Sequence, residues 1–366
     1  MAYIYQKQDW AKFRWDNEHL LTLLGTVRHL QGKLIGSMEM LGFDMKAETM
    51  LETLTLDVVK TTEIEGEIFN PEQVRSSLAQ RLGIEISNAV VSNQDIDGIV
   101  DLLLDAIQKS HLPLSNDRFF DWHFSLFPTG RSGMHKILVG QYRNDETGPM
   151  QVVSGALGRE NVHFQAPSSD IVEVEMTQFI NWINAEQTID PVLKAGIAHL
   201  WFLTIHPFDD GNGRIARAIT DMLLTKADGI LQRYYSMSAQ ILKEKKEYYI
   251  ILEKSQKGTL DITDWLEWFL NCLLNALKTS NNLLTNVLDR NKFWHQYPEN
   301  TFNERQRLVL NKLLNDFFGK LTSSKWAKMT KCSRDTALRD IQDLIDKGIL
   351  KKDEGGGRNT SYTFFS

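Results

Sequence analysis

One run of twelve residues, 206–217 (HPFDDGNGRIAR), constrains this chain more than any other feature. The apolar stretch 193–205 precedes it and good helix formers, 215–224, follow it, so the pattern predicts a helix, a tight turn and a second helix. Two glycines flank Asn212, and backbone without Cβ atoms permits both a sharp turn and the close approach of a ligand. A helix that starts in such a turn points several N–H groups the same way. The sequence therefore predicts an anion site at this helix start.

The same run contains side chains suited to chemistry on a bound anion. Arg214 and Arg217 are three residues apart, so both project from one helical face towards the anion. Asp210 offers the hard oxygen ligand that Mg²⁺ prefers, and His206 supplies an imidazole that can remove a proton. Alone, each feature is most often a helix end or a turn. Together they predict the transfer of a phosphate-linked group.

The run resembles the signature of the Fic family, His-Pro-Phe-x-Asp/Glu-Gly-Asn-Gly-Arg-x-x-Arg, at every specified position. The resemblance extends over roughly residues 50–275. It implies a mainly α fold, a helical Fic core with a β-hairpin flap. It also implies transfer of AMP from ATP to a hydroxyl side chain of a target protein, with release of pyrophosphate. A kinase-like relative has Lys where this chain has Gly213, so the resemblance is to the nucleotidyl-transferring variant.

The resemblance also implies roles for the residues of the signature. His206 is the general base on the target hydroxyl, and Asp210 holds Mg²⁺. The phosphates of ATP are bound by Gly211, Asn212, Gly213, Arg214 and Arg217, of which the two arginines bind the β- and γ-phosphates.

A second motif, Thr61-x-x-x-Glu65-Gly66, resembles the inhibitory motif of Fic proteins. A carboxylate delivered by a neighbouring helix can pair with Arg217 and occupy the place that the γ-phosphate needs. We therefore expect an auto-inhibited enzyme.

The flap and the adenine site rest on the same resemblance. The hairpin at 152–167 resembles the flap that aligns a target segment by β-augmentation, and its nucleotide-side edge is expected at Val162, His163 and Phe164. Tyr248 and Gln256 are expected to contact the adenine. The alternative for Tyr248 is an aromatic core residue. A core position is favoured for His199, which lies seven residues before the signature histidine.

Helical patterning covers most of the chain. The expected helices lie within 17–66 (with a break at Gly42), after Asn70-Pro71, and at 94–109, 117–127, 170–184, 191–205, 215–226, 243–254 and 262–288. Short β-prone runs at 151–153 and 162–164, with a turn at 158–161, predict the hairpin.

The C-terminal residues form a separate pattern after a polar linker at 298–303. Helices at 304–318, 323–329 and 334–347, then strands at 349–351 and 362–364 around a turn at 354–359, resemble a winged helix-turn-helix. Residues 320–366 contain ten Lys and Arg against six Asp and Glu, whereas the whole chain has a net charge of −6. This contrast permits contacts with DNA phosphates but does not indicate sequence-specific contacts with bases. Two roles therefore remain possible for residues 304–366: DNA binding, and protein interaction or dimerisation.

We therefore expect three domains in the 366 residues: an N-terminal helical region (1–110) with the inhibitory motif, a Fic catalytic domain (111–297) and a winged helix (304–366). Two distant cysteines, Cys272 and Cys332, fit reduced thiols in a cytoplasmic protein. The N-terminus does not read as a signal peptide, and no apolar window is long enough for a membrane span. A homodimer is expected from the resemblance alone.

Three functions remain open on the sequence. The first is an auto-inhibited protein adenylyltransferase that uses ATP and Mg²⁺ on a Ser, Thr or Tyr hydroxyl of a target protein, the chain itself included. The second is a nucleotide-sensing regulator that binds DNA through the winged helix. The third keeps the fold but transfers UMP, or removes AMP with Glu65 orienting a water.

Overall fold

The computed structural model describes residues 2–87, 89–146, 148–155, 159, 161–186, 188–298, 301–314, 320–353 and 360–364. The chain divides into two compact units, Met1–Ser280 and Asn281–Ser366. The division falls within one helix, α11 (Thr263–Gln296), which extends beyond its expected end at residue 288.

The first unit begins with a short 3-10 helix, η1 (Ile4–Gln6), followed by α1 (Asn17–Glu39), α2 (Phe43–Ile64) and α3 (Pro71–Leu82). The expected break at Gly42 is confirmed, since Gly42 directly precedes α2. The expected start of α3 is confirmed as well, because the Asn70 side chain accepts a hydrogen bond from Glu72 N at 2.8 Å.

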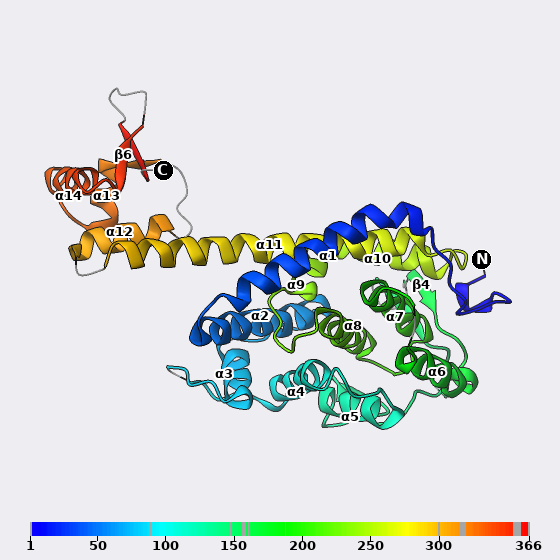
Figure 1. The fold of residues 1–366 in the computed structure, drawn as a ribbon. Coiled ribbons are helices and arrows are strands. Elements are labelled where there is room, and N and C mark those ends of the chain that lie inside the picture. The colour runs from blue at the N-terminus through cyan, green and yellow to red at the C-terminus, as the bar shows by residue number, and fades with distance from the viewer. Residues whose placement is uncertain are drawn as a thin grey trace. The chain divides into compact units, whose positions relative to one another are not determined.

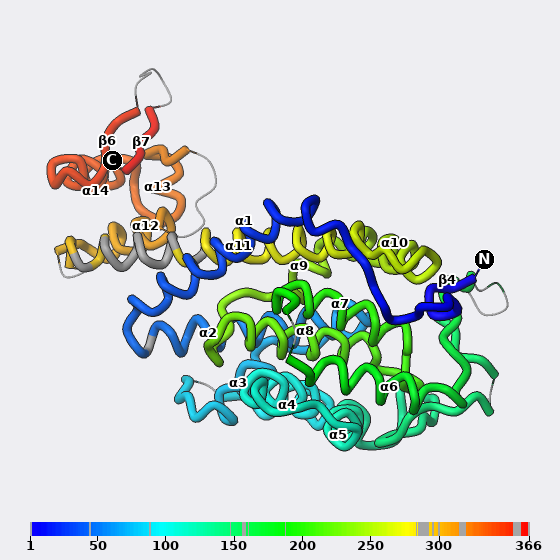
Figure 2. Tube along the Cα trace, turned by 45° about the vertical axis from the view of Figure 1, so that its right-hand side comes forward, coloured from blue at the N-terminus to red at the C-terminus, as the bar shows by residue number. Residues whose placement is uncertain are grey.

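The helices that follow build the core of this unit: α4 (Gln94–Gln108), α5 (Asn116–Leu126), α6 (Ser169–Asn184), α7 (Pro191–Ile205), α8 (Asn212–Asp228), α9 (Met237–Lys243) and α10 (Lys245–Gln256). α7 and α8 lie side by side in the middle of the unit (Figures 1 and 2). Nearly every residue of α7 is buried, as its continuous apolar sequence predicts. α8 also contacts α1, α2, α4 and α9, so the signature run starts a helix that is enclosed on several sides.

Two small hairpins interrupt the helices. β3 (Gln151–Ser154) and β4 (Asn161–Gln165) pair antiparallel, with a register shift between Val152 and Val153, so the predicted hairpin is confirmed. Most of its predicted turn at 158–161 lies outside the described residues. The other hairpin, β1 (Arg131–Ser132) with β2 (His135–Lys136), was not predicted, because two-residue strands have no detectable alternation.

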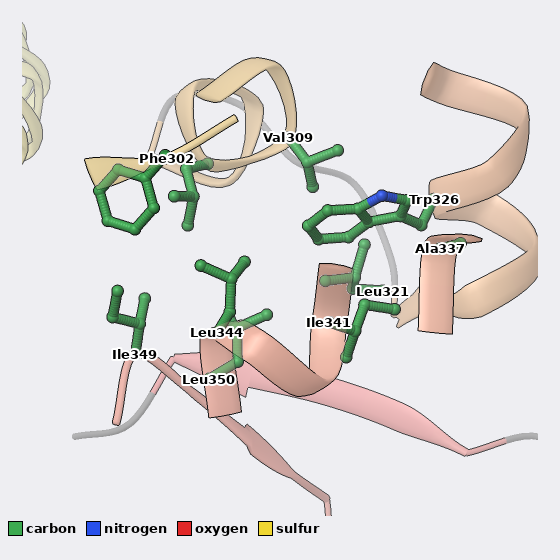
Figure 3. Close-up of a cluster of buried hydrophobic side chains, with 10 residues drawn as sticks. Phe302, Val309, Leu321, Trp326, Ala337, Ile341, Leu344, Ile349 and Leu350 are labelled. Atoms are coloured by element: carbon green, nitrogen blue, oxygen red, sulfur yellow. The ribbon is translucent and has the colours of Figure 1, made fainter. Parts of the chain in front are cut away.

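The second unit contains, in order, α12 (Glu304–Leu314), β5 (Leu321–Thr322), α13 (Ser323–Thr330), α14 (Arg334–Asp346), β6 (Leu350–Lys352) and β7 (Ser361–Phe364). The strands form an antiparallel sheet in the order β5-β7-β6. Figure 3 shows its core, in which Trp326, Leu344 and Leu350 gather with other apolar side chains from the helices and strands. The expected end of the first helix (315–318) and the expected turn at 354–359 lie outside the described residues, and β5 is a strand that the sequence did not indicate.

Helices therefore dominate the described chain, and its sheets are small. None of the described helices combines the length and the apolar character that crossing a bilayer requires.

Candidate active site

The turn between α7 and α8 is held in shape by its own residues. His206 ends α7 in the left-handed conformation (φ 53°), and its N–H donates to Phe202 O at 2.9 Å. The Asn212 side chain accepts from Phe208 N at 3.0 Å and donates to Phe208 O at 2.8 Å. Because both ends of this amide bind the turn, the Asn212 side chain shapes the turn and only its backbone N–H is available to a ligand.

Gly211 and Gly213 leave space for different groups. Gly211 precedes α8 with φ 81°, and a Cβ there would lie 2.9 Å from the Phe127 ring. A Cβ at Gly213 would instead collide with Oε1 of Glu65. The space above the first turn of α8 is therefore filled by a carboxylate that comes from α2.

This carboxylate is bound by the second arginine of the signature. Glu65 Oε1 accepts from Arg217 Nη2 at 2.6 Å. Arg217 is 2% exposed, and it also donates to Thr61 Oγ1 at 2.6 Å and to Thr61 O at 3.1 Å. Gly66 follows with φ 90°, a left-handed conformation that favours glycine just after a helix. Glu65 thus lies beside N–H groups at a helix start, where the helix dipole favours an anion.

The first arginine of the signature has a similar partner. Arg214 Nη1 lies 3.2 Å from Glu67 Oε2, and the guanidinium lies 4.9 Å from the centre of the Phe127 ring. Arg214 Nε is buried and has no acceptor among the described residues. The sequence did not indicate Glu67, since no spacing rule links this loop residue to Arg214.

His206 has the properties of a base. Nδ1 lies 3.3 Å from Leu203 O, and because a carbonyl only accepts, Nδ1 carries the proton and Nε2 keeps its lone pair. Burial lowers the pKa of His206 to about 4, so the imidazole is neutral at physiological pH.

Arg143, which the sequence did not indicate, fixes the backbone at His206 and Pro207. Its Nε donates to His206 O at 2.8 Å, its backbone N–H donates to Pro207 O at 2.9 Å, and its Nη2 donates to Pro167 O at 2.5 Å. Asp145 pairs with the same guanidinium at 2.9 Å. Apart from Asp145, Arg143 binds only backbone carbonyls, of the turn and of Pro167, so no side-chain pattern in the sequence could have indicated this contact.

Asp210 is the candidate metal ligand. Its carboxylate accepts from Gly211 N at 2.6 Å and from the Ser132 hydroxyl, so β1 helps to orient it. No cluster of three potential ligands occurs among the described residues. A single carboxylate nevertheless fits Mg²⁺, which is commonly bound through one or two carboxylates together with substrate phosphates and water.

A pocket of about 580 Å³, a volume in the usual range of small-molecule sites, contains part of the predicted site. Asp210, Gly211, Asn212 and Arg214 are not among the residues that line it. Glu65, Gly213 and Arg217 lie at its anion end together with His206, and β3, β4, α10 and Leu203 of α7 supply the rest of its wall. The predicted His163, Phe164, Tyr248 and Gln256 line it, whereas Val162 does not and is 39% exposed.

The predicted adenine contacts are largely engaged by protein. Tyr248 is 1% exposed and its hydroxyl lies 2.9 Å from His199 Nε2, while the other nitrogen of His199 lies 2.8 Å from Thr220 Oγ1. This agrees with the core alternative for Tyr248, and the core interpretation of His199 is confirmed. Gln256 donates to Leu203 O at 3.2 Å. Tyr249, which is 39% exposed, offers the pocket a more accessible ring.

A buried acidic pair lies behind Arg217. Asp57, Thr61 and Glu65 recur every four residues on and just after α2, and they face Gly213, Arg217 and Asp221, which recur in the same way on α8. Arg233 donates to Asp221 Oδ1 at 2.9 Å, whereas Asp57 Oδ2 has no partner among the described residues. Burial raises the pKa of Asp57 to about 7, and the neighbouring Asp221 carboxylate adds to the effect.

Asp57→Asn should therefore stabilise the protein at pH 8. The folded-state pKa lies above that of an unfolded aspartate, so the folded state holds a proton that the unfolded state releases, and stability falls as pH rises from about 4 to about 7. Asparagine removes this charge and can still accept from Ser236. We expect a gain of at least ~1 kcal/mol at pH 8 that shrinks towards pH 5, measured by thermal unfolding. A wild-type chain as stable as the variant at pH 8 would contradict this.

Comparison with known proteins connects this geometry to a family. Residues 113–224 match the model of the Fic/DOC family, and residues 3–84 match a domain of unknown function, DUF4172, which includes α1, α2, α3 and Glu65. A protein adenylyltransferase of Caenorhabditis elegans, Fic-1, is 26% identical over 250 residues, 66% of this chain and 45% of that protein. A probable protein adenylyltransferase of Aquifex aeolicus is 33% identical over 103 residues, 28% of this chain and 30% of that protein. The chain thus spans less than half the length of these curated relatives.

Solved structures give the same picture of the fold. A Fic family protein from Desulfovibrio desulfuricans G20 aligns with a TM-score of 0.52 at 18% identity, over 94% of this chain and 95% of that one. Fic-1 of C. elegans aligns with a TM-score of 0.54 at 20% identity, over 74% of each chain. Such identities show the fold alone. The chain thus has a Fic/DOC domain with adenylyltransferase homologues and a mainly helical fold with Fic neighbours.

Proposed function

We propose that this chain is an auto-inhibited protein adenylyltransferase, which transfers AMP from ATP to a Ser, Thr or Tyr hydroxyl of a target protein. The observation that carries the proposal is the pocket in which the neutral His206, the start of α8 and Arg217 meet. The names of the homologous adenylyltransferases support it. In this proposal, residues 1–110 regulate and residues 111–297 catalyse.

The anion end of the pocket suits the phosphates. Backbone N–H groups at the start of α8 face them, and Arg214 and Arg217 take the β- and γ-phosphates. The adenine of ATP then lies between α10 and the β3–β4 hairpin, where Tyr249 and Gln256 line the pocket. Asp210 would hold Mg²⁺, which would supply positive charge to offset the negative charge that develops on the departing pyrophosphate.

The chemistry is an in-line displacement at the α-phosphorus. Nε2 of His206 accepts the proton of the target hydroxyl as its oxygen attacks, and the bond between the α-phosphorus and the pyrophosphate oxygen breaks. The helix-start amides and the arginines stabilise the charge on the leaving group without rearranging. Arg143 holds the peptide of His206 in place during this step.

The transfer test uses the complete chain with Mg²⁺, cell lysate and either labelled ATP or labelled UTP. Mass spectrometry should find an AMP moiety on hydroxyl side chains of lysate proteins or of the chain itself. Transfer from UTP alone, or loss of AMP from previously modified proteins without any transfer, would favour the other reactions of this fold.

The pH dependence of transfer should report the low pKa of His206. Because the neutral imidazole is the active form, kcat/KM should fall on acidification only near pH 4 to 5, well below the 6.5 of an ordinary histidine. Rates measured from pH 4 to 8 on a folded sample check this. A fall in kcat/KM centred near pH 6.5 would contradict this prediction.

A second candidate function rests on the second unit. Its order of helices and strands, α12-β5-α13-α14-β6-β7, supports a winged helix, and Arg334 and Arg339 are exposed on α14. DNA binding by residues 304–366 predicts a gel shift that weakens with salt and with Arg334→Ala or Arg339→Ala. If these variants shift DNA like the wild type, α14 is not the DNA-binding helix.

A further inference from the structure

A chain of hydrogen bonds joins both strands of the hairpin to α10. His163 on β4 lies with Nε2 2.6 Å from Ser154 Oγ on β3, and with Nδ1 2.8 Å from Glu253 Oε2 on α10. Glu253 Oε1 in turn accepts from Lys257 Nζ at 2.5 Å. Side chains of β3, β4 and α10 are thus connected along the pocket wall, and Lys257, just after α10, extends the chain.

The donors in this chain follow from its chemistry. The Glu253 carboxylate accepts, so Nδ1 of His163 carries a proton, and Nε2 is hydrogen-bonded to the Ser154 hydroxyl. Both ring nitrogens are engaged. His163 therefore has no free nitrogen for a nucleotide or a target, and its contribution is the link itself.

The hairpin needs such a link. Its strands have four and five residues and a register shift, and an isolated two-stranded hairpin is at best marginally stable. One face is held by Phe164, which is 2% exposed and packs 5.1 Å from Tyr3 and 6.1 Å from Tyr5, measured between ring centres. His163 is the residue of β4 without a partner on β3, at the register shift, and its side chain ties the hairpin to α10 through Glu253.

We propose that His163 is a positioning residue, which fixes the β3–β4 hairpin against α10 by linking Ser154 to Glu253. This sets the wall of the pocket that contains His206 and Arg217. Reaction geometry is sensitive to such placement, since a displacement of about 1 Å can cost about 100-fold in rate. The part of this inference that concerns AMP transfer rests on the proposed function.

The test uses the complete chain carrying Glu65→Gly, so that the pocket is open, and ATP as the probe. His163→Ala should speed hydrogen exchange of the amides at 151–154 and 161–165 by about tenfold, which corresponds to about 1.4 kcal/mol. AMP transfer should fall by about 10- to 100-fold. Calorimetric affinity for ATP should change less than transfer does.

Two conservative variants separate the two hydrogen bonds of His163, one to Glu253 and one to Ser154. His163→Asn retains an amide N–H near Nδ1 for Glu253, and His163→Gln places an acceptor near Nε2 for Ser154. Compared with His163→Ala, each variant should restore part of the protection from hydrogen exchange and part of the AMP transfer. Lys254→Ala is the matched control, because Lys254 lies on the same helix but pairs with Asp264 at 2.6 Å, and it should leave both readouts unchanged.

Exchange in His163→Ala that equals that of its parent overturns the inference. Faster exchange with undiminished transfer overturns the positioning role. If the Glu65→Gly parent itself transfers no AMP, the proposed function fails, and the exchange measurement still decides whether His163 fixes the hairpin.

Discussion

Glu65→Gly should raise the rate of AMP transfer by about 10- to 100-fold at limiting ATP. Glu65 Oε1 lies 2.6 Å from Arg217 Nη2 and directly above Gly213, so in the proposed function a nucleotide phosphate would compete with the carboxylate for one place. A hydrogen bond to a charged group contributes about 1.5 to 3 kcal/mol, which leaves the open state populated at roughly one part in ten to one in a hundred. The apparent affinity for ATP is reduced by that fraction, and removal of the carboxylate restores it. The side chain of Glu65 is 31% exposed, so the lower end of the range is the safer expectation.

Incorporation of label from ATP over time, with calorimetry for ATP affinity, measures this effect. Glu63→Gly is the matched control, because it places the same flexible residue in the last turn of α2 but removes a carboxylate that pairs with Lys60 at 2.6 Å. Transfer by Glu65→Gly at the wild-type rate, with unchanged ATP affinity, would mean that this ion pair does not block the site.

The local features of the fold were predictable because each depends on nearby residues. Asn70 and Pro71 start α3, Ser333 precedes α14 and accepts from Thr336 N at 3.2 Å, and Gly211 permits the sharp entry into α8. In each case the chemistry that begins the helix lies within three residues of its first turn.

The contact between Glu65 and Arg217 was expected from the motif and not from periodicity alone. The 4-residue spacing of Asp57, Thr61 and Glu65 shows that they share a face, but it does not say what that face contacts. Only the packing of α2 on α8 brings this row opposite the signature helix.

Other parts of the site depend on contacts between distant segments. Arg143 binds backbone carbonyls of His206 and Pro167, and Ser132 reaches Asp210 from a two-residue strand. Every residue has a backbone carbonyl, so the sequence does not show which carbonyls Arg143 binds. A two-residue strand has no detectable periodicity, so the sequence does not indicate Ser132 either. The hydrogen bond between Tyr248 and His199 was not predictable for a related reason, since it joins residues 49 positions apart on two helices.

Replacement of His206 should reduce AMP transfer by at least about 100-fold, the usual range for loss of a general base being 10²- to 10⁴-fold. Nε2 is the nitrogen left free by the bond from Nδ1 to Leu203 O, and the low pKa keeps it unprotonated. The residue is also structural, because it ends α7 with φ 53°, a conformation that costs most side chains about 1 to 2 kcal/mol. Alanine therefore removes the base and strains the turn together.

His206→Asn separates these two effects, since asparagine tolerates the left-handed conformation better than alanine but cannot act as a base at neutral pH. In the Glu65→Gly background, both variants should bind ATP about as tightly as their parent, because the phosphate-binding groups lie at 211–217. Both should lose transfer, while only alanine should lower the unfolding temperature noticeably. Transfer by folded His206→Asn at near the parental rate would remove His206 from the mechanism, because a neutral amide cannot accept the proton that the attacking hydroxyl must release.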